Sequence, residues 1–196
     1  MDLQAWDTAL LLWINRTWAN PLLDQFMPWV TYLGSAYAVV VAILLVGWRL
    51  QRRRAACRAV VVACLCLCLA LVYGVVAGAY NGLKYEVQRL RPFVALGAEL
   101  RVAAEQVQAI RPDSSFPSGH AANAFMLATL LTALLRPRRW PLWFGLATLV
   151  ALSRVYLGLH YPGDVLAGAL LGAGLSGLLL RLPWLAQRLR MTDTGG

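Results

Sequence analysis

The chain has little histidine and little charge. Only two of its 196 residues are histidines and 14% are charged, whereas 60% are hydrophobic, and the mean hydropathy is +0.60. Because soluble domains carry about 25% charged residues, this composition excludes an ordinary soluble fold and indicates a membrane protein. A chain that keeps histidine at two positions alone is expected to use it for chemistry, which makes His120 and His160 the first candidate site residues.

The cysteine pattern argues against a zinc or redox site. The chain contains no C-x-x-C pair, and no histidine lies near its cysteines. Three of them lie in one apolar stretch, where a thiol behaves as a small apolar side chain. We therefore expect these cysteines to bind no metal, and no cofactor is expected. The four residues are Cys57, Cys64, Cys66 and Cys68.

The sequence has no repeat and no low-complexity tract that would divide it. Its length is about that of one domain, so we expect a single domain over residues 1–196 with a frayed tail at 191–196. The N-terminal segment has acidic residues before its apolar run and no small-residue cleavage site, which argues against a cleaved signal peptide.

Five apolar stretches approach the ~20 residues needed to cross a bilayer core. The fold class is therefore predicted to be all-α, a polytopic membrane helical bundle. The stretches cover residues 30–48, 59–80, 118–135, 140–157 and 163–182.

The segment Leu3–Thr17 is different, because polar residues such as Asp7 interrupt its helical apolar pattern. It is rich in tryptophan, and amphipathic indoles favour the headgroup level. We predict an interfacial helix here. A sixth span is the alternative.

The net charge of +9 reports topology rather than nucleic-acid binding. Arginines cluster after the first, third and fifth stretches, so alternating spans place all three clusters on one side. Positive residues in short loops mark the cytoplasmic side, and we expect a multi-pass protein of the inner (plasma) membrane. The clusters are Arg49, Arg52, Arg53, Arg54 and Arg58; Arg136, Arg138 and Arg139; and Arg181, Arg188 and Arg190.

Three polar blocks interrupt the apolar pattern. They are KYEVQRLRP at 84–92, PSGH at 117–120 and SRVYLGLHYPGD at 153–164. The same alternation places all three opposite the arginine clusters. The blocks are therefore predicted to converge on the exoplasmic face, toward the periplasm or the outside.

The PSGH block has the chemistry of an anion site at a helix start. Ser118 fits the N-cap position and Gly119 permits close backbone approach. The free N–H groups and the positive dipole end of such a helix attract phosphate. His120 would lie in the first turn, beside the anion.

The third block pairs a histidine with a carboxylate. His160 and Asp164 are four residues apart at the start of the fifth stretch. In a helix or tight turn the carboxylate reaches one ring nitrogen, which fixes the tautomer and aims the other nitrogen at substrate.

Three cations near the ends of the apolar stretches complete the pattern. Lys84, Arg91 and Arg154 would be costly at that depth without an anion, and a phosphate is a suitable partner. By contrast, we interpret Arg89, Arg101 and Arg111 as interfacial residues that extend toward the headgroups.

The longest polar loop lies between the first two blocks, at residues 93–116. It has the composition for a short helix between Ala95 and Ile110. A lid or headgroup selector and a solvated connector are the two interpretations of this loop.

Together the blocks form the pattern K-x6-RP, PSGH and SR-x5-H-x3-D, which resembles the type 2 phosphatidic acid phosphatase superfamily of membrane lipid phosphatases. That superfamily shares its phosphate site with vanadium haloperoxidases. The pattern is matched without departure from Lys84 to Asp164, and the residues before Lys84 carry little of it.

The resemblance implies a six-helix core and a metal-independent reaction. His160 would attack phosphorus to form a phosphohistidine, Asp164 would orient it, and His120 would protonate the leaving oxygen and then activate water. The phosphate oxygens would be held by Lys84, Arg91, Ser118, the Gly119 amide and Arg154.

The expected function is hydrolysis of a lipid mono- or diphosphate within the bilayer, with undecaprenyl diphosphate as the first candidate and cell wall biogenesis as the setting. Phosphatidylglycerophosphate, phosphatidate and lipid A are alternative substrates. A lipid phosphotransferase, a haloperoxidase, and a transporter or non-catalytic lipid-binding protein are alternative functions. Nucleic acid is not an expected partner.

Overall fold

The computed structural model describes residues 3–52, 59–102, 110–135 and 137–183. Over this part of the chain it contains helices and no strands, which confirms the predicted all-α class. The longer helices are α1 (Leu3–Thr17), α2 (Pro21–Tyr32), α3 (Ala36–Arg52), α4 (Ala59–Val87), α7 (Gly119–Leu134), α8 (Trp140–Tyr156) and α9 (Pro162–Leu179); the short ones are α5 (Pro92–Ala95), η1 (Gly97–Glu99) and η2 (Pro137–Arg139).

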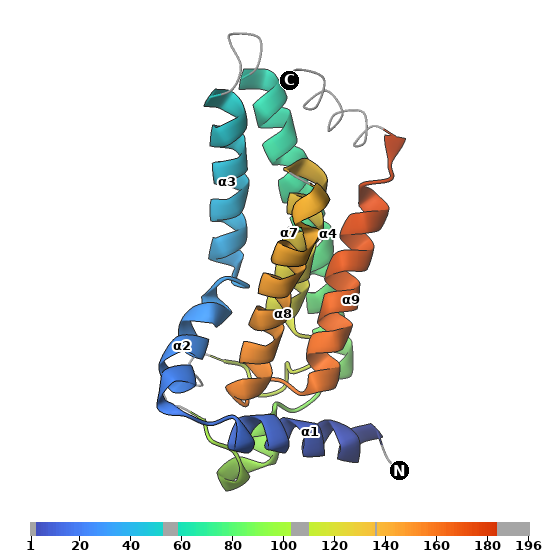
Figure 1. Cartoon of the computed structure of the whole chain (residues 1–196). Coiled ribbons are helices and arrows are strands. Elements are labelled where there is room, and N and C mark those ends of the chain that lie inside the picture. The colour runs from blue at the N-terminus through green and yellow to red at the C-terminus, as the bar shows by residue number, and fades with distance from the viewer. Residues whose placement is uncertain (1–2, 53–58, 103–109, 136, 184–196) are drawn as a thin grey trace.

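The helices α3, α4, α7, α8 and α9 run side by side as a bundle (Figure 1). They correspond to the five predicted apolar stretches. By length and composition, two helical stretches of the described residues can each cross a membrane, Ala63–Ala95 and Pro162–Leu179, and the bent pair Pro21–Tyr32 and Ala36–Arg49 makes a third. Helix α7 is 16 residues long and α8 is 17 residues long.

Helix α1 lies across one end of the bundle instead of running along it (Figure 1). Its apolar residues Leu3, Trp6, Leu10 and Trp13 are exposed, while Asn15 is buried. Leu11 and Ile14 are buried as well, so the helix carries apolar residues on both its buried and its exposed side, unlike a soluble surface helix. This arrangement favours the interfacial interpretation over a sixth span.

The predicted apolar stretch at residues 30–48 is divided between two helices, because α2 and α3 meet at a bend of 61°. A Cβ on Gly34 would lie 2.6 Å from the His120 carbonyl oxygen, so the break lets this turn approach α7 closely. The start of α2 was missed although Asn20 caps it and Pro21 occupies its first turn.

Helices α7 and α9 pack through glycine. A Cβ on Gly168 would overlap the Ser118 carbonyl oxygen, and one on Gly172 would overlap that of Ala122. Because the helices approach so closely, their N-termini lie together, and Ser118 N donates to the Asp164 carbonyl at 2.9 Å. The second and third sequence blocks therefore meet.

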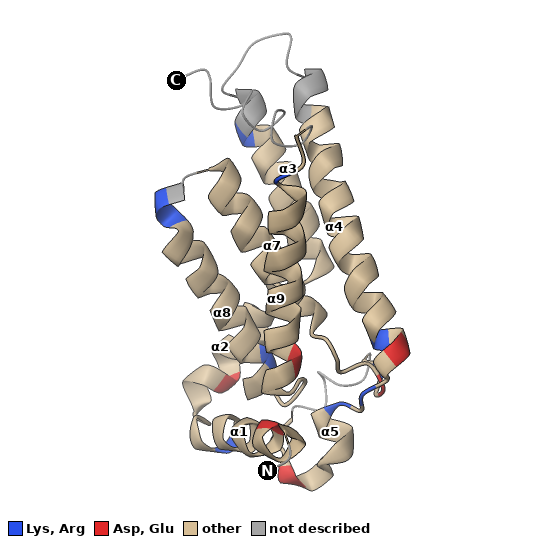
Figure 2. Ribbon diagram, turned by 90° about the vertical axis from the view of Figure 1, so that its right-hand side faces the viewer, with Lys and Arg blue, Asp and Glu red and all other residues tan. Residues whose placement is uncertain are grey.

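The ends of the bundle differ in the way that the charge pattern predicts. Helices α3, α7 and α9 end at the face away from α1, whereas the three polar blocks lie on the α1 side (Figures 1 and 2). Six members of the arginine clusters lie outside the described residues, as do Cys57 and the tail at 191–196. These six are Arg53, Arg54, Arg58, Arg136, Arg188 and Arg190.

The loop from 93 to 116 is described only in part. It begins with α5 and η1, while residues 103–109, where most of the predicted helix would lie, are outside the described residues. Its return segment, residues 110–116, runs back to the N-terminus of α7 and contributes to the site.

Candidate active site

A cavity of about 1310 Å³ lies where the three sequence blocks converge. The last turn of α4, the start of α7 and the junction of α8 with α9 form its polar part. It contains six of the eight predicted site residues: Lys84, Arg91, Gly119, His120, Arg154 and His160. The other two, Ser118 and Asp164, are fully buried behind it.

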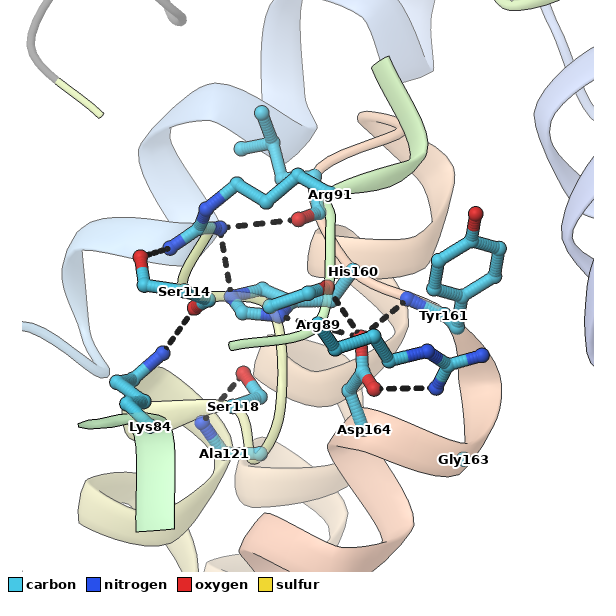
Figure 3. Close-up of polar contacts among 12 residues, drawn as sticks. Lys84, Arg89, Arg91, Ser114, Ser118, Ala121, His160, Tyr161, Gly163 and Asp164 are labelled. Atoms are coloured by element: carbon cyan, nitrogen blue, oxygen red, sulfur yellow. Dashed lines mark hydrogen bonds and ion pairs between the residues drawn. The ribbon is translucent and has the colours of Figure 1, made fainter. Parts of the chain in front are cut away.

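His160 lies in the loop between α8 and α9 and is 1% exposed. Its Nε2 atom is 3.0 Å from Nη1 of Arg91 (Figure 3). A guanidinium has donors only, so Nε2 must be the acceptor. The proton of the neutral ring is therefore on Nδ1, and the lone pair of Nε2 lies on the cation-bearing side.

The environment keeps this imidazole unprotonated. Burial, followed by the positive charges of Arg91, Arg154 and Lys84, holds the pKa of His160 well below its ordinary value of 6.5. A neutral ring keeps an unprotonated nitrogen, which a nucleophile needs.

Asp164 faces the other nitrogen of His160. Its Oδ2 is 3.6 Å from Nδ1, an ion-pair distance longer than a hydrogen bond. That oxygen also accepts from the Ser115 hydroxyl at 2.5 Å and from Tyr161 N at 2.9 Å. Asp164 therefore faces Nδ1 of His160 as predicted, although no hydrogen bond joins them and Nδ1 has no hydrogen-bond partner among the described residues. Ser115 is a partner of Asp164 that was not predicted.

The predicted N-cap at Ser118 is confirmed. Its hydroxyl accepts from Ala121 N at 3.5 Å, and the residue has no exposed surface, so in this arrangement the side chain serves the helix start and does not line the cavity. Gly119 permits the close approach of Tyr80, whose Cε2 would be 3.0 Å from an added Cβ. His120 follows in the first turn and lines the cavity.

The three predicted cations surround the same cavity. Lys84, the only lysine in the sequence, donates to the Ser114 carbonyl. Arg91 donates from Nε to the Arg111 carbonyl at 2.9 Å and from Nη1 to the Leu159 carbonyl at 3.0 Å. These partners are neutral, so the hydrogen bonds fix the cations without cancelling their charge.

Arg154 is held in a similar way by a residue from the N-terminal part. It is 4% exposed, and its Nη1 donates to Thr31 Oγ1 of α2 at 2.8 Å. Its Nε is buried without a hydrogen-bond partner among the described residues. Thr31 was not predicted as part of the site, because it lies far from every block in the sequence.

The interfacial interpretation of Arg89 is wrong. Its Nη1 is 2.6 Å from Oδ1 of Asp164, and its Nη2 is 2.8 Å from Oδ2 of Asp7 in α1. A buried carboxylate requires compensation, and Arg89 supplies it. The available signal was its position inside the first block, two residues before Arg91.

The other two arginines given that interpretation differ from each other. Arg101 is half exposed and pairs with Asp24 at 2.9 Å. Arg111 pairs with Asp113 at 3.3 Å and also lines the cavity. Among the described residues, no group of three or more His, Cys, Asp or Glu side chains could hold a metal ion.

Comparison with known proteins finds one matching family and several similar proteins. The family model described as the PAP2 superfamily matches residues 61–188. The undecaprenyl-diphosphatase BcrC of Bacillus subtilis is 34% identical over 167 residues, which are 82% of this chain and 74% of that protein.

Two further curated relatives match over shorter regions. The lipid A 4'-phosphatase of Bacteroides thetaiotaomicron is 52% identical over 58 residues, 29% of this chain. The undecaprenyl-diphosphatase of Sulfolobus acidocaldarius is 35% identical over 115 residues, 58% of this chain. The chain spans 26% of the length of the first protein and 52% of the second.

Two solved structures share the fold over nearly the whole chain. LpxE of Aquifex aeolicus superposes with a TM-score of 0.70 at 27% identity, covering 89% of this chain and 94% of that one. A transmembrane PAP2-type phosphatidylglycerolphosphate phosphatase of Bacillus subtilis gives 0.69 at 28% identity, covering 90% and 84%.

Proposed function

The chain belongs to the PAP2 superfamily, and on that premise we propose that it is a membrane phosphatase that hydrolyses a lipid mono- or diphosphate. One observation carries the proposal: both histidines and three cations line a single cavity, with the catalytic carboxylate directly behind them. Cations fixed by neutral partners attract a phosphate and stabilise its charge in the transition state.

The reaction starts at His160. Its Nε2 lone pair attacks phosphorus and forms a phosphohistidine, while His120 gives its proton to the leaving oxygen. Asp164 stabilises the positive charge that develops on the ring through the 3.6 Å contact with Nδ1. His120 then takes a proton from water, which hydrolyses the intermediate, so that one difficult displacement becomes two easier ones.

The phosphate oxygens are held by Lys84, Arg91, Arg154 and the backbone amide of Gly119. The unpartnered Nε of Arg154 gives this assignment physical support, because a ligand oxygen would satisfy it. Ser118 contributes indirectly by capping the helix that presents Gly119, or directly if its hydroxyl turns toward the ligand.

Undecaprenyl diphosphate is the first candidate substrate. A fourth cation, Arg111, lines the cavity, which suits the extra charge of a diphosphate. The named activity of the Bacillus subtilis relative supports the same choice. Phosphatidylglycerophosphate and lipid A are the alternatives that the other similar proteins favour.

We place the site at the exoplasmic face of the inner membrane. The described arginines Arg138 and Arg139 belong to η2, at the end of the bundle away from the site. Positive residues in short loops favour the cytoplasmic side, so the cavity faces outward. A cysteine probe at the exposed residue Ala98 of η1, on the α1 side of the bundle, that reacted from the cytoplasmic side would contradict this orientation.

A phosphate-release panel tests the function. Purified protein in detergent is given undecaprenyl diphosphate, phosphatidylglycerophosphate, phosphatidate and lipid A, with His160→Ala as the background control. We expect release above that background, fastest with undecaprenyl diphosphate. Equal release by both proteins on every substrate would rule out the proposal, and transfer to an added lipid in preference to water would indicate a phosphotransferase.

Metal independence is tested in the same assay. The predicted site residues that line the cavity include no carboxylate, so we expect EDTA to leave the rate unchanged. Inhibition by EDTA that magnesium reverses would replace the mechanism with a metal-assisted one.

A further inference from the structure

A chain of ion pairs behind the cavity connects α1 to the catalytic carboxylate. It runs from Asp7 through Arg89 to Asp164, with oxygen to nitrogen distances of 2.8 and 2.6 Å. The phosphate chemistry described above does not use Asp7 or Arg89, and neither residue lines the cavity. Their role therefore needs a separate explanation.

The Asp164 carboxylate has no exposed surface. Within the described residues, Arg89 is the only arginine or lysine that forms an ion pair with it. Arg89 binds Oδ1, which leaves Oδ2 for Ser115, Tyr161 N and the face of His160 that carries Nδ1 (Figure 3). The arginine thus decides which oxygen faces the histidine.

Arg89 is itself held on several sides. Its Nη2 contacts Asp7 at 2.8 Å and Gln4 at 2.9 Å, both in α1. Its guanidinium lies 4.0 Å above the ring of Tyr161, a favourable cation–π geometry. A long side chain fixed at one planar face and at both terminal nitrogens loses little further freedom when it orients another group.

Asp7 also contacts the start of α9 directly. Its Oδ1 accepts from Gly163 N at 2.6 Å, a free N–H of the first helical turn. A Cβ on Gly163 would lie 2.9 Å from Asp7 Oδ2, so glycine is what admits the carboxylate here. One side chain of α1 therefore contacts both Arg89 and the helix that bears Asp164.

We propose that Arg89, held in place by Asp7, is a positioning residue that orients Asp164 toward His160, so that α1 forms part of the catalytic apparatus. This inference rests on the proposed function. It adds residues that touch neither substrate nor the reacting atoms and act through the carboxylate.

The kinetic test compares Arg89→Met with Arg101→Ala. Arg101 is a matched control because it lies on the same side of the bundle and also pairs with a carboxylate at 2.9 Å. We expect Arg89→Met to lower kcat about 100-fold with KM within about twofold, since misplacing a reacting group by about 1 Å has an effect of this order. Arg101→Ala should keep the wild-type kcat.

Two milder variants sharpen the result. Arg89→Lys keeps the charge but loses the planar fork, so it should recover part of the kcat lost in Arg89→Met. Asp7→Asn keeps an oxygen for Gly163 N and removes the charge that holds Arg89, so it should lower kcat less than Arg89→Met does. Thermal unfolding in detergent should show all four variants folded.

A spectroscopic test needs no activity. The chain has only two histidines, so nitrogen-15 labelled histidine gives two imidazoles, which a His120→Gln sample assigns. Arg89→Met should shift the Nδ1 resonance of His160 and leave that of His120 in place, and Arg101→Ala should shift neither.

The outcomes separate the two claims. Wild-type protein that releases no phosphate from the panel contradicts the proposed function, and the His160 resonance then still decides the positioning role. Active wild type with Arg89→Met matching Arg101→Ala in kcat overturns the positioning role alone. An unchanged His160 resonance in folded Arg89→Met overturns it as well.

Discussion

The N-terminal part of the chain and the segment from Lys84 to Asp164 serve the same site in different ways. The later segment supplies most residues at the polar end of the cavity, including both histidines. The earlier part supplies Asp7, which binds Arg89, and Thr31, which binds Arg154. The difference teaches that a short motif can define the chemistry while distant and unremarkable residues fix its geometry.

The largest expected effect lies within the later segment. Loss of a nucleophile lowers kcat on the order of 10⁶-fold in well-studied hydrolases, so His160→Ala should reduce phosphate release below detection. His120→Ala removes only proton transfer and should retain activity about 10²- to 10⁴-fold below wild type. A phosphate-release assay checks both, and equal losses would contradict the separate roles.

The close contact of α7 with α9 should be the most sensitive packing position. Gly172→Leu would force a side chain against the Ala122 carbonyl, and such overpacking costs about 1–3 kcal/mol or more. Gly174→Leu is the matched control, because nothing lies within 4 Å of a Cβ there. Thermal unfolding in detergent should show a lower Tm for Gly172→Leu only.

Thr31→Val tests the contribution of the N-terminal part directly. It removes the hydrogen bond that the Thr31 hydroxyl accepts from the buried guanidinium of Arg154. A hydrogen bond to a charged group contributes roughly 1.5–3 kcal/mol, so we expect kcat/KM to fall on the order of 10- to 100-fold. Thr31→Ser keeps the hydroxyl and should stay near wild type. If the two variants have equal kcat/KM, the N-terminal part does not support Arg154 in the way described.

The smallest effect concerns pH. The pKa of His160 is held well below 6.5, so this group loses its lone pair only when the pH falls through that lowered value. The acid limb of kcat/KM should therefore lie below pH 6.5. Lys84→Met removes one of the cations that lower the pKa, so the limb should move to higher pH, whereas Thr31→Val should leave it in place.

Much of the fold could be predicted because apolar length is a strong signal in a bilayer. The ends of the predicted stretches at 118–135 and 140–157 lie within one residue of α7 and α8. The bend before α3 could not be predicted in that way. It depends on the close approach of Gly34 to the His120 carbonyl. Such a contact joins two segments that are distant in the sequence, so it produces no periodic pattern of apolar residues.

In the site, too, contacts between distant segments could not be predicted from the sequence. The residue types of the three blocks predicted which side chains gather at the cavity, because buried cations and paired histidines are rare in apolar chains. Arg89 was misread since a lone arginine at a helix end is usually interfacial. Only its 2.6 Å contact with buried Asp164 distinguishes it, and Thr31 and Ser115 likewise gain significance only through their partners.

The glycine contact between α7 and α9 also divides the backbone electrostatics of the site. Each helix carries about half a positive elementary charge at its N-terminus, and the contact brings both N-termini together. Under the proposed function the α7 end, at Gly119, acts on the phosphate in the cavity, whereas the α9 end acts on the Asp164 carboxylate in its first turn. This part of the attraction resides in peptide groups, so it does not titrate and no single side-chain truncation removes it.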